Sequence, residues 1–268
     1  MAHTLRPLSL GQLLDETFNI YRRNFLLFVG ISAIPNLVLL VFQLAVATAF
    51  SQSTDVLVAM PTTVALWFAS LFVNSIVVAA TTFGVSDLYL ETPTSIMACF
   101  SRVSGKALRV VYVSFVTSLI IGIGFAFCIV PGIYLAGRFG LAIPAVVLER
   151  ITGNQSLRRS LDLTQGFAGR VILVYFLTTI FSVIMAIALS AVVRAVGAIA
   201  FHDTGILTQQ AFDTIFTSLG SIVFGPVTAI ALTLAYYDQR VRREAFDIEH
   251  MMSLMNAQGT QASGTAIS

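Results

Sequence analysis

Five long stretches of this chain contain no charged residue, and this feature restricts its fold more than any other. No Asp, Glu, Lys or Arg occurs within residues 24–54, 56–86, 110–137, 171–193 or 214–237. Each stretch exceeds the roughly 20 apolar residues that a helix needs to cross a bilayer. Only 10% of all residues are charged, whereas soluble domains carry about 25%. We therefore expect an all-α polytopic membrane protein, and the composition excludes an ordinary cytosolic enzyme.

The charge-free stretches divide into six predicted transmembrane helices. They cover residues 25–50, 56–83, 108–130, 132–148, 170–200 and 212–237. The third and fourth come from one apolar region, which we expect to turn at Pro131 and Gly132, because proline seldom continues a helix and glycine permits a tight turn. The fourth helix would be about 25 Å long at 1.5 Å per residue, so it just spans. A re-entrant hairpin at this turn is the alternative.

Most basic residues fall on one side of this six-span arrangement. Of the 15 Lys and Arg residues, 13 lie at or beyond the ends of the spans on the same side: Arg6, Arg22, Arg23, Arg102, Lys106, Arg109, Arg150, Arg158, Arg159, Arg170, Arg240, Arg242 and Arg243. The positive-inside rule places such residues in the cytoplasm. We therefore expect both termini there, in a cell (inner) membrane. This basic face should attract anionic lipid headgroups, and no feature indicates nucleic acid as a partner.

A short motif recurs before each odd-numbered span. Ser9, Ser95 and Ser156 are each followed fourteen residues later by an arginine. Serine is a typical N-cap, because its hydroxyl accepts a hydrogen bond from the first helical turn, and the residues after Ser9 are amphipathic. We therefore expect a bundle of three hairpins, each preceded by a short cytoplasmic interfacial helix. The alternative is that juxtamembrane segments are generally basic and amphipathic, so that part of the similarity is generic.

The predicted organisation has four parts. Residues 1–24 form an N-terminal amphipathic helix, and residues 25–237 form the six-span membrane domain. Residues 238–255 form a C-terminal cytoplasmic helix, because their apolar residues recur at spacings of four and three. Residues 256–268 contain too few large apolar side chains to pack, and we expect them to be disordered.

The sequence shows no cluster of side chains suited to catalysis or metal binding. His3, His202 and His250 lie in three separate segments, with no Cys or carboxylate at ligand spacing beside them. Motifs for an activated serine, a zinc protease or a phosphate-binding loop do not occur. Because a catalytic site needs titratable groups gathered in one place, we expect no enzyme activity, no metal and no cofactor.

Arg138 is the basic residue that the topology explains least. It lies about 9 Å inside the expected outer end of the fourth span, at 1.5 Å per residue. A guanidinium at that depth is costly unless it snorkels, meets water or pairs, and its candidate partners are Asp203, Asp213 and the carbonyls freed near Pro131. Arg138 therefore indicates either an anion or lipid-headgroup site in an outward cavity or a structurally paired side chain.

Asn36 and Asn74 are uncharged polar residues at membrane depth in the first two spans. Amide side chains in such positions commonly form hydrogen bonds between helices. Together with Arg138 they make up the candidate intramembrane polar residues, which are either functional or structural.

Several short motifs are shared with one group of bacterial membrane proteins. They occupy residues 8–14, 131–136 (PGIYLA), 138–139, 142–144, 148–150, 160–164 and 236–247. With these motifs, most of residues 5–255 resembles the multi-pass family known as the glycerophosphodiester phosphodiesterase membrane domain. The resemblance implies a membrane module. Members joined to a phosphodiesterase carry a separate soluble catalytic barrel, for which six spans leave no room here, so the resemblance does not imply that activity.

Two functions are consistent with these observations. The absence of clustered chemistry favours a non-enzymatic scaffold or assembly partner, which binds another protein or a second copy of itself. The alternative is a transporter or a lipid- or anion-handling membrane protein with an outward cavity near Arg138.

Overall fold

The computed structural model describes residues 9–49, 56–149, 151–200 and 206–244, and every regular element within these ranges is an α-helix. In chain order the helices are α1 (Leu10–Arg23), α2 (Phe25–Ala49), α3 (Val56–Tyr89), α4 (Ile96–Ser104), α5 (Ala107–Phe127), α6 (Ile129–Phe139), α7 (Ala142–Leu148), α8 (Gly153–Thr164), α9 (Ala168–Ala200) and α10 (Ile206–Glu244). Most of the predicted C-terminal helix and the predicted disordered tail lie outside the described residues.

Six segments of the described chain are long and apolar enough to cross a membrane, in agreement with the sequence. They are Phe25–Ala49, Ala59–Tyr89, Ala107–Phe127, Ile129–Leu148, Ala168–Ala195 and Ala211–Arg243. Many of their large apolar side chains are exposed, as Leu108 and Ile187 are at 85% and 61%. Apolar surface of this extent is unusual in a soluble monomer and suits contact with lipid tails. The protein is therefore an all-helical, multi-pass membrane protein.

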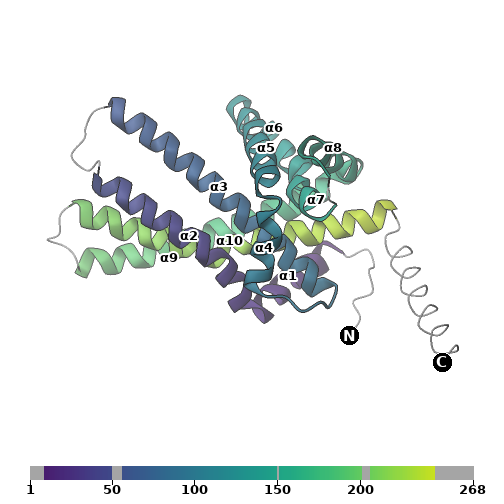
Figure 1. Ribbon diagram of the computed structural model, residues 1–268, viewed down its shortest axis with the longest axis horizontal. Helices are drawn as coiled ribbons and strands as arrows, with labels where there is room; N and C mark the ends of the chain where they lie inside the picture. The colour runs from purple at the N-terminus through teal and green to yellow at the C-terminus, as the bar shows by residue number, and fades with distance from the viewer. Residues whose placement is uncertain (1–8, 50–55, 150, 201–205, 245–268) are drawn as a thin grey trace.

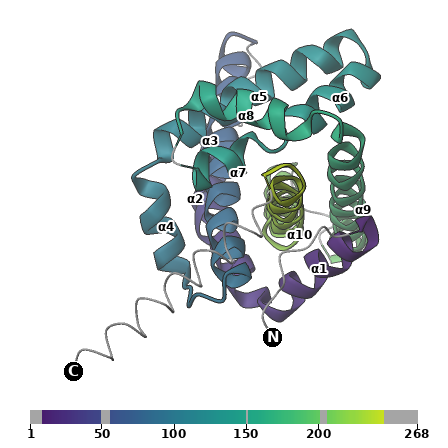
Figure 2. The ribbon, with the colours of Figure 1, turned by 90° about the vertical axis from the view of Figure 1, so that its right-hand side faces the viewer.

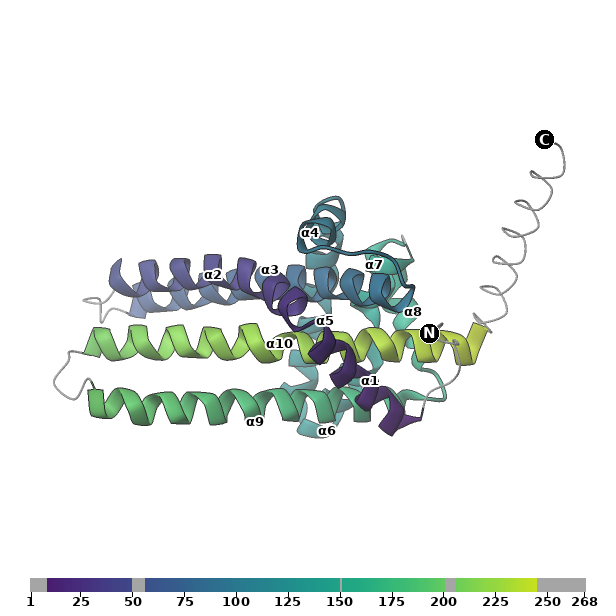
Figure 3. The same cartoon turned by 90° about the horizontal axis from the view of Figure 1, so that it is seen from below.

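The four longest helices lie side by side along the long axis of the molecule (Figures 1 and 3). They are α2, α3, α9 and α10, while α5 and α6 pack against each other and project from the side of this group (Figure 1). The short helices α1, α4, α7 and α8 gather towards one end (Figure 1). We call this the basic end, because it carries Arg22, Arg23, Arg102, Lys106, Arg158, Arg159 and Arg170.

Helix α10 lies at the centre of the basic end. Seen along the long axis it is surrounded by other helices (Figure 2), and it contacts α1, α2, α3, α7, α8 and α9. Residues 229–239 are buried without interruption. The helix also continues past residue 238 to Glu244, so the described chain has no boundary where a separate C-terminal helix was predicted.

The turn between the third and fourth spans differs from the prediction. The chain leaves the helical conformation at Cys128, whose φ of −172° and ψ of 159° are extended. Pro131 and Gly132 instead lie in the first turn of α6, where proline is tolerated because those N–H groups have no helical partner. The fourth span is itself interrupted after Phe139, so α6 and α7 together make up Ile129–Leu148.

Two glycines allow α6 to lie close to both of its neighbours. A Cβ on Gly124 of α5 would lie 3.0 Å from the Cα of Gly132, and a Cβ on Gly137 of α6 would lie 2.0 Å from Cγ1 of Ile172 in α9. Any larger residue at these two positions would force the helices apart, since membrane helices approach closely only through small residues. Helix α6 is thereby held against α5 and α9, and all three helices contribute to the wall of one cleft.

The predicted serine caps are confirmed for two of the three short helices. Ser9 Oγ accepts from the Gln12 N–H at 3.2 Å and Gln12 Oε1 accepts from the Ser9 N–H at 2.9 Å, a reciprocal capping box. Ser95 Oγ caps α4 at 3.3 Å. The prediction for Ser156 is wrong, because Thr152 is the N-cap of α8 and Ser156 is buried inside that helix.

Candidate ligand-binding cleft

An open cleft of about 650 Å³ lies within the membrane-spanning part of the protein. It is bounded by α3, α5, α6, α7, α9 and α10, so distant parts of the chain contribute to it. Its wall is mostly apolar, with Trp67 and Phe125 among the lining residues. The hydroxyl and amide side chains in the wall are Ser70, Asn74, Ser75, Ser114, Thr117, Ser118, Tyr175 and Thr228. A concave, largely apolar site with a few polar groups is typical of small-molecule binding.

Two of these polar groups are buried and have no hydrogen-bond partner among the described residues. They are the hydroxyls of Ser114 and Thr117, whose residues are 7% and 8% exposed. A helical Ser or Thr ordinarily donates to a carbonyl one turn back, as Thr178 does to the Val174 carbonyl at 2.8 Å. A buried hydroxyl without a partner costs about 1–3 kcal/mol. Ser114 and Thr117 therefore place two hydroxyl donors beside the cleft whose hydrogen bonds are not satisfied within the described residues.

The wall of the cleft is uncharged. Of the residues that the structure describes, those that line the cleft include no Asp, Glu, His, Lys, Arg or Cys. An unpaired ionised group is strongly disfavoured in a dry, apolar environment. The cleft therefore suits a molecule with hydroxyl, ester or amide groups and apolar chains better than it suits a phosphate or a carboxylate.

The polar groups share one face on each of two helices. Ser114, Thr117 and Ser118 are spaced by three and four residues on α5, and such residues are neighbours on a helix surface. On α3, Ser70 and Asn74 are one turn apart, and Asn74 Nδ2 donates to the Ser70 carbonyl at 2.8 Å. The periodic serine and threonine positions in an otherwise apolar α5 are the signal by which the sequence could have indicated the cleft.

The three candidate residues from the sequence do not come together. Asn74 lines the cleft, whereas Asn36 is 8% exposed and its Nδ2 donates to the Ser32 carbonyl at 2.8 Å within α2. Arg138 is also absent from the cleft wall, although Phe139 beside it is present. The predicted polar residues thus form no common site, and Asn74 alone belongs to the cleft.

Arg138 lies beside α8 and the basic end. It occupies the last turn of α6, and its carbonyl accepts a hydrogen bond from Ser160 Oγ of α8 at 2.7 Å. Asp213, one of its candidate partners, instead pairs with Arg194 at 3.1 Å. Asp203 lies outside the described residues. The outward cavity expected near Arg138 is therefore not the site that the geometry of the described chain indicates.

Ion pairs and hydrogen bonds join the helices at the basic end. Asp87 pairs with Arg102 at 2.7 Å. Glu149 pairs with Arg159 at 2.9 Å and accepts a hydrogen bond from the Tyr236 hydroxyl at 2.5 Å. Asp238 pairs with Arg170 at 2.9 Å and with Arg242 at 3.1 Å. The hydrogen bond that Arg102 donates to Asp87 raises the pKa of Arg102, so its guanidinium stays charged. These contacts hold α4 to α3, α8 to the end of α7, and α9 to α10.

Metal-binding groups are not gathered in the described parts of the chain. Within those ranges no three His, Cys, Asp or Glu side chains lie where they could hold one metal ion. Burial raises the pKa of the Cys99 thiol, which keeps it protonated and a poor ligand.

Comparison with known proteins finds no matching family model, no similar curated protein and no similar solved structure.

Proposed function

We propose that this protein binds an uncharged polar lipid in the cleft. The observation that carries the proposal is the pair of buried hydroxyls, Ser114 and Thr117, which have no partner in an uncharged wall. Each can donate to an ester or hydroxyl oxygen of the lipid. The apolar wall, including Trp67 and Phe125, would contact the acyl chains. The cleft wall contains no carboxylate, histidine or lysine among the described residues, which favours binding or transfer over catalysis.

We further propose that the protein lies in the cell membrane with its basic end and both termini in the cytoplasm. Contacts between α2 and α3, between α5 and α6 and between α9 and α10 support three hairpins. Helices α1, α4 and α8 each come before one of these pairs, and their position at the basic end supports a role as interfacial helices (Figure 1).

We also propose that the chain is related to the glycerophosphodiester phosphodiesterase membrane domain, as a membrane module. The shared sequence motifs support this relation, and four of them are in contact in the folded chain. Glu149 in one motif accepts from Tyr236 in another, and the Arg138 carbonyl of a third accepts from Ser160 of a fourth. These four motifs therefore contact one another in two pairs.

Removing the two hydroxyls tests the lipid-binding function. We expect Ser114→Ala combined with Thr117→Val to weaken binding of dioleoylglycerol about tenfold, because two hydrogen bonds contribute about 0.5–1.5 kcal/mol each. Titration of the detergent-purified full chain by native mass spectrometry measures this. The unmodified protein should also prefer dioleoylglycerol to dioleoylphosphatidic acid, since the cleft has no cation to pair with a phosphate.

Thr178→Val is the matched control for this experiment. Thr178 is buried in α9 and bonds to its own helix, and it does not line the cleft. Its replacement should leave dioleoylglycerol binding unchanged. An equal loss in the control, or a preference for phosphatidic acid, would show that the cleft is not the binding site.

The second candidate function is the scaffold or assembly partner, which includes pairing with a second copy. It is favoured by α4, an amphipathic helix at the basic end whose Met97 is 75% exposed. A scaffold predicts that cross-linking in native membranes traps a stable partner through α4, and that Met97→Glu removes this product. A cross-linking pattern identical in the two proteins would count against the scaffold.

A further inference from the structure

Asn74 is the one amide or carboxyl side chain among the described residues that line the cleft. Its Nδ2 donates to the Ser70 carbonyl one turn back at 2.8 Å. The reverse orientation of the amide would bring Oδ1 against that carbonyl, and two acceptors repel each other. The amide oxygen of Asn74 is therefore turned away from the backbone of α3, and no described residue donates a hydrogen bond to it. A ligand in the cleft can reach this acceptor, because the side chain is accessible there.

The cleft thus offers hydrogen-bonding groups of two kinds. Ser114 and Thr117 have hydroxyls without a partner, and Asn74 has an amide oxygen without a donor. Phe115, which lies between the two hydroxyl residues in α5, stacks on Phe68 of α3 with ring centroids 5.9 Å apart, so the two helices are in contact near these groups. A ligand that satisfies all three must itself donate to Asn74 and accept from the two hydroxyls.

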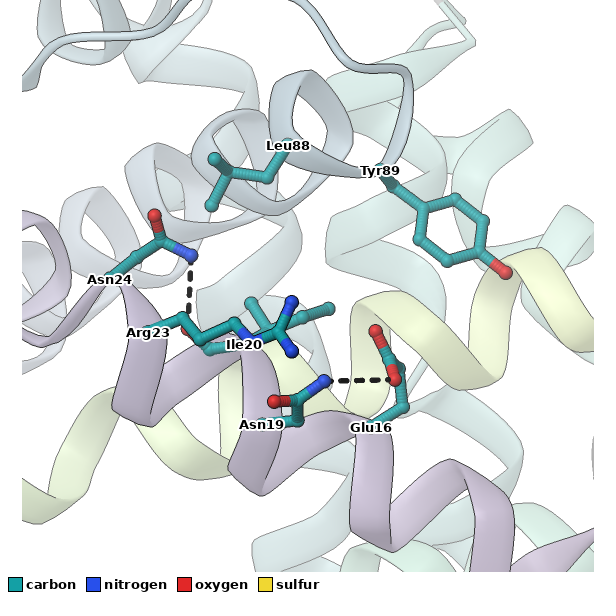
Figure 4. Close-up of a pocket in the computed structure, with 7 residues that line it drawn as sticks. All are labelled: Glu16, Asn19, Ile20, Arg23, Asn24, Leu88 and Tyr89. Atoms are coloured by element: carbon teal, nitrogen blue, oxygen red, sulfur yellow. Dashed lines mark hydrogen bonds between the residues drawn. The ribbon is translucent and has the colours of Figure 1, made fainter. Parts of the chain in front are cut away.

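The backbone bond of Asn74 recurs at two other asparagines, but their surroundings differ. Asn24 and Asn36 each donate to the carbonyl four residues earlier, at 3.2 and 2.8 Å. Asn24 lies in the wall of a smaller pocket, of about 130 Å³, at the basic end between α1 and the end of α3, together with the charged Glu16 and Arg23 (Figure 4). Asn36 lines neither of these two pockets. Of the three, Asn74 therefore combines the fixed amide with an uncharged wall.

We infer that Asn74 restricts the cleft to lipids that carry a free hydroxyl group. The inference rests on the proposed binding of an uncharged lipid in the cleft, and it identifies the part of that lipid that is recognised. In a diacylglycerol the alcohol O–H donates to Asn74 Oδ1, while ester oxygens accept from Ser114 and Thr117. A glycerol whose third oxygen is also substituted has the same apolar chains but no O–H. It leaves the Asn74 oxygen covered and unpaired, which is how a site that bonds a hydroxyl rejects an analogue without one.

Dioleoylglycerol and its 3-O-methyl ether test the inference, because the two lipids differ only in the O–H. Titration of the detergent-purified full chain by native mass spectrometry should show that the unmodified protein binds the alcohol about tenfold more tightly. Asn74→Leu should lower the affinity for the alcohol alone, so that the two lipids bind equally. Asn74→Gln retains an amide oxygen and should keep part of the preference.

Asn36→Leu is the matched control, because Asn36 forms the same bond within α2 and does not line the cleft. The tenfold preference should persist in this variant. A loss of preference in Asn36→Leu equal to that in Asn74→Leu would overturn the role of Asn74. Equal binding of the two lipids to the unmodified protein would overturn it as well.

The double variant Ser114→Ala, Thr117→Val separates this result from the outcome for the cleft itself. It should weaken both lipids by the same factor and leave their ratio unchanged, because Asn74 is intact. Weakened binding in the double variant, with a ratio of one in the unmodified protein, would retain the cleft and refute the role of Asn74. Undiminished binding of both lipids in the double variant would overturn the cleft as the site, and this inference with it.

Discussion

Replacing Gly122 by tryptophan is expected to abolish dioleoylglycerol binding without unfolding the protein. Gly122 lines the cleft, and a Cβ built on it meets no atom within 4 Å. The indole would therefore occupy the cleft instead of displacing a helix. Glycine in a helix interior lowers the stability of the helix by about 1 kcal/mol relative to a good helix former. Replacing Gly122 therefore does not weaken α5 itself. Lipid titration and a thermal denaturation curve of the purified variant measure the two effects.

Gly169→Trp provides the comparison for this variant. Gly169 lies near the start of α9, has open space around its Cβ and is not part of the cleft wall. The Gly169→Trp protein should bind dioleoylglycerol as the unmodified protein does. Full binding by the Gly122→Trp protein would mean that the lipid occupies a different site.

The largest loss of stability is expected for Asp238→Ala. Asp238 has a side chain that is 0% exposed, and it lies between Arg170 at 2.9 Å and Arg242 at 3.1 Å. Removing the carboxylate leaves the Arg170 guanidinium, at 17% exposure, without its counter-ion. Breaking a buried ion pair in this way costs about 3–5 kcal/mol. The midpoint of thermal unfolding in detergent should therefore fall by many degrees.

The ion pair of Arg194 and Asp213 is the control for Asp238→Ala. Its side chains are 63% and 48% exposed, and exposed pairs contribute about 0–1 kcal/mol. Asp213→Ala should therefore shift the unfolding midpoint little. Similar shifts in the two variants would contradict the role assigned to Asp238 in joining α9 to α10.

The membrane spans can be predicted because the absence of charge over more than twenty residues has a single strong physical cause. The exact ends of the spans cannot be predicted in this way. Pro131 is expected to stop a helix, yet it lies in the first turn of α6, where its missing N–H has no consequence, and the chain turns at Cys128 instead. Thr152 likewise begins α8 one turn before Ser156. Local preferences of this kind are weak beside the packing of neighbouring helices.

The candidate site can be predicted only in part, because the sequence shows which residues are polar but not which of them lack a partner. Asn74 is conspicuous as an amide in an apolar span and does line the cleft. Ser114 and Thr117 are not conspicuous, since hydroxyls in membrane helices usually bond to their own backbone. Ser114 and Thr117 do not form such bonds, and this can be seen only in the three-dimensional structure. Arg138 is the most conspicuous single residue, and it lies beside α8.

The central position of α10 has a consequence for biosynthesis. The helix that contacts α1, α2, α3, α7, α8 and α9 follows all of them in the chain, and chains are synthesised from the N-terminus. Until it emerges from the ribosome, Arg170 lacks Asp238 and Glu149 lacks the Tyr236 hydroxyl. Until then the earlier helices lack these two contacts with the helix that they will surround. The arrival of the last helix supplies both contacts, so a chain terminated before α10 lacks the helix that joins the others at the basic end.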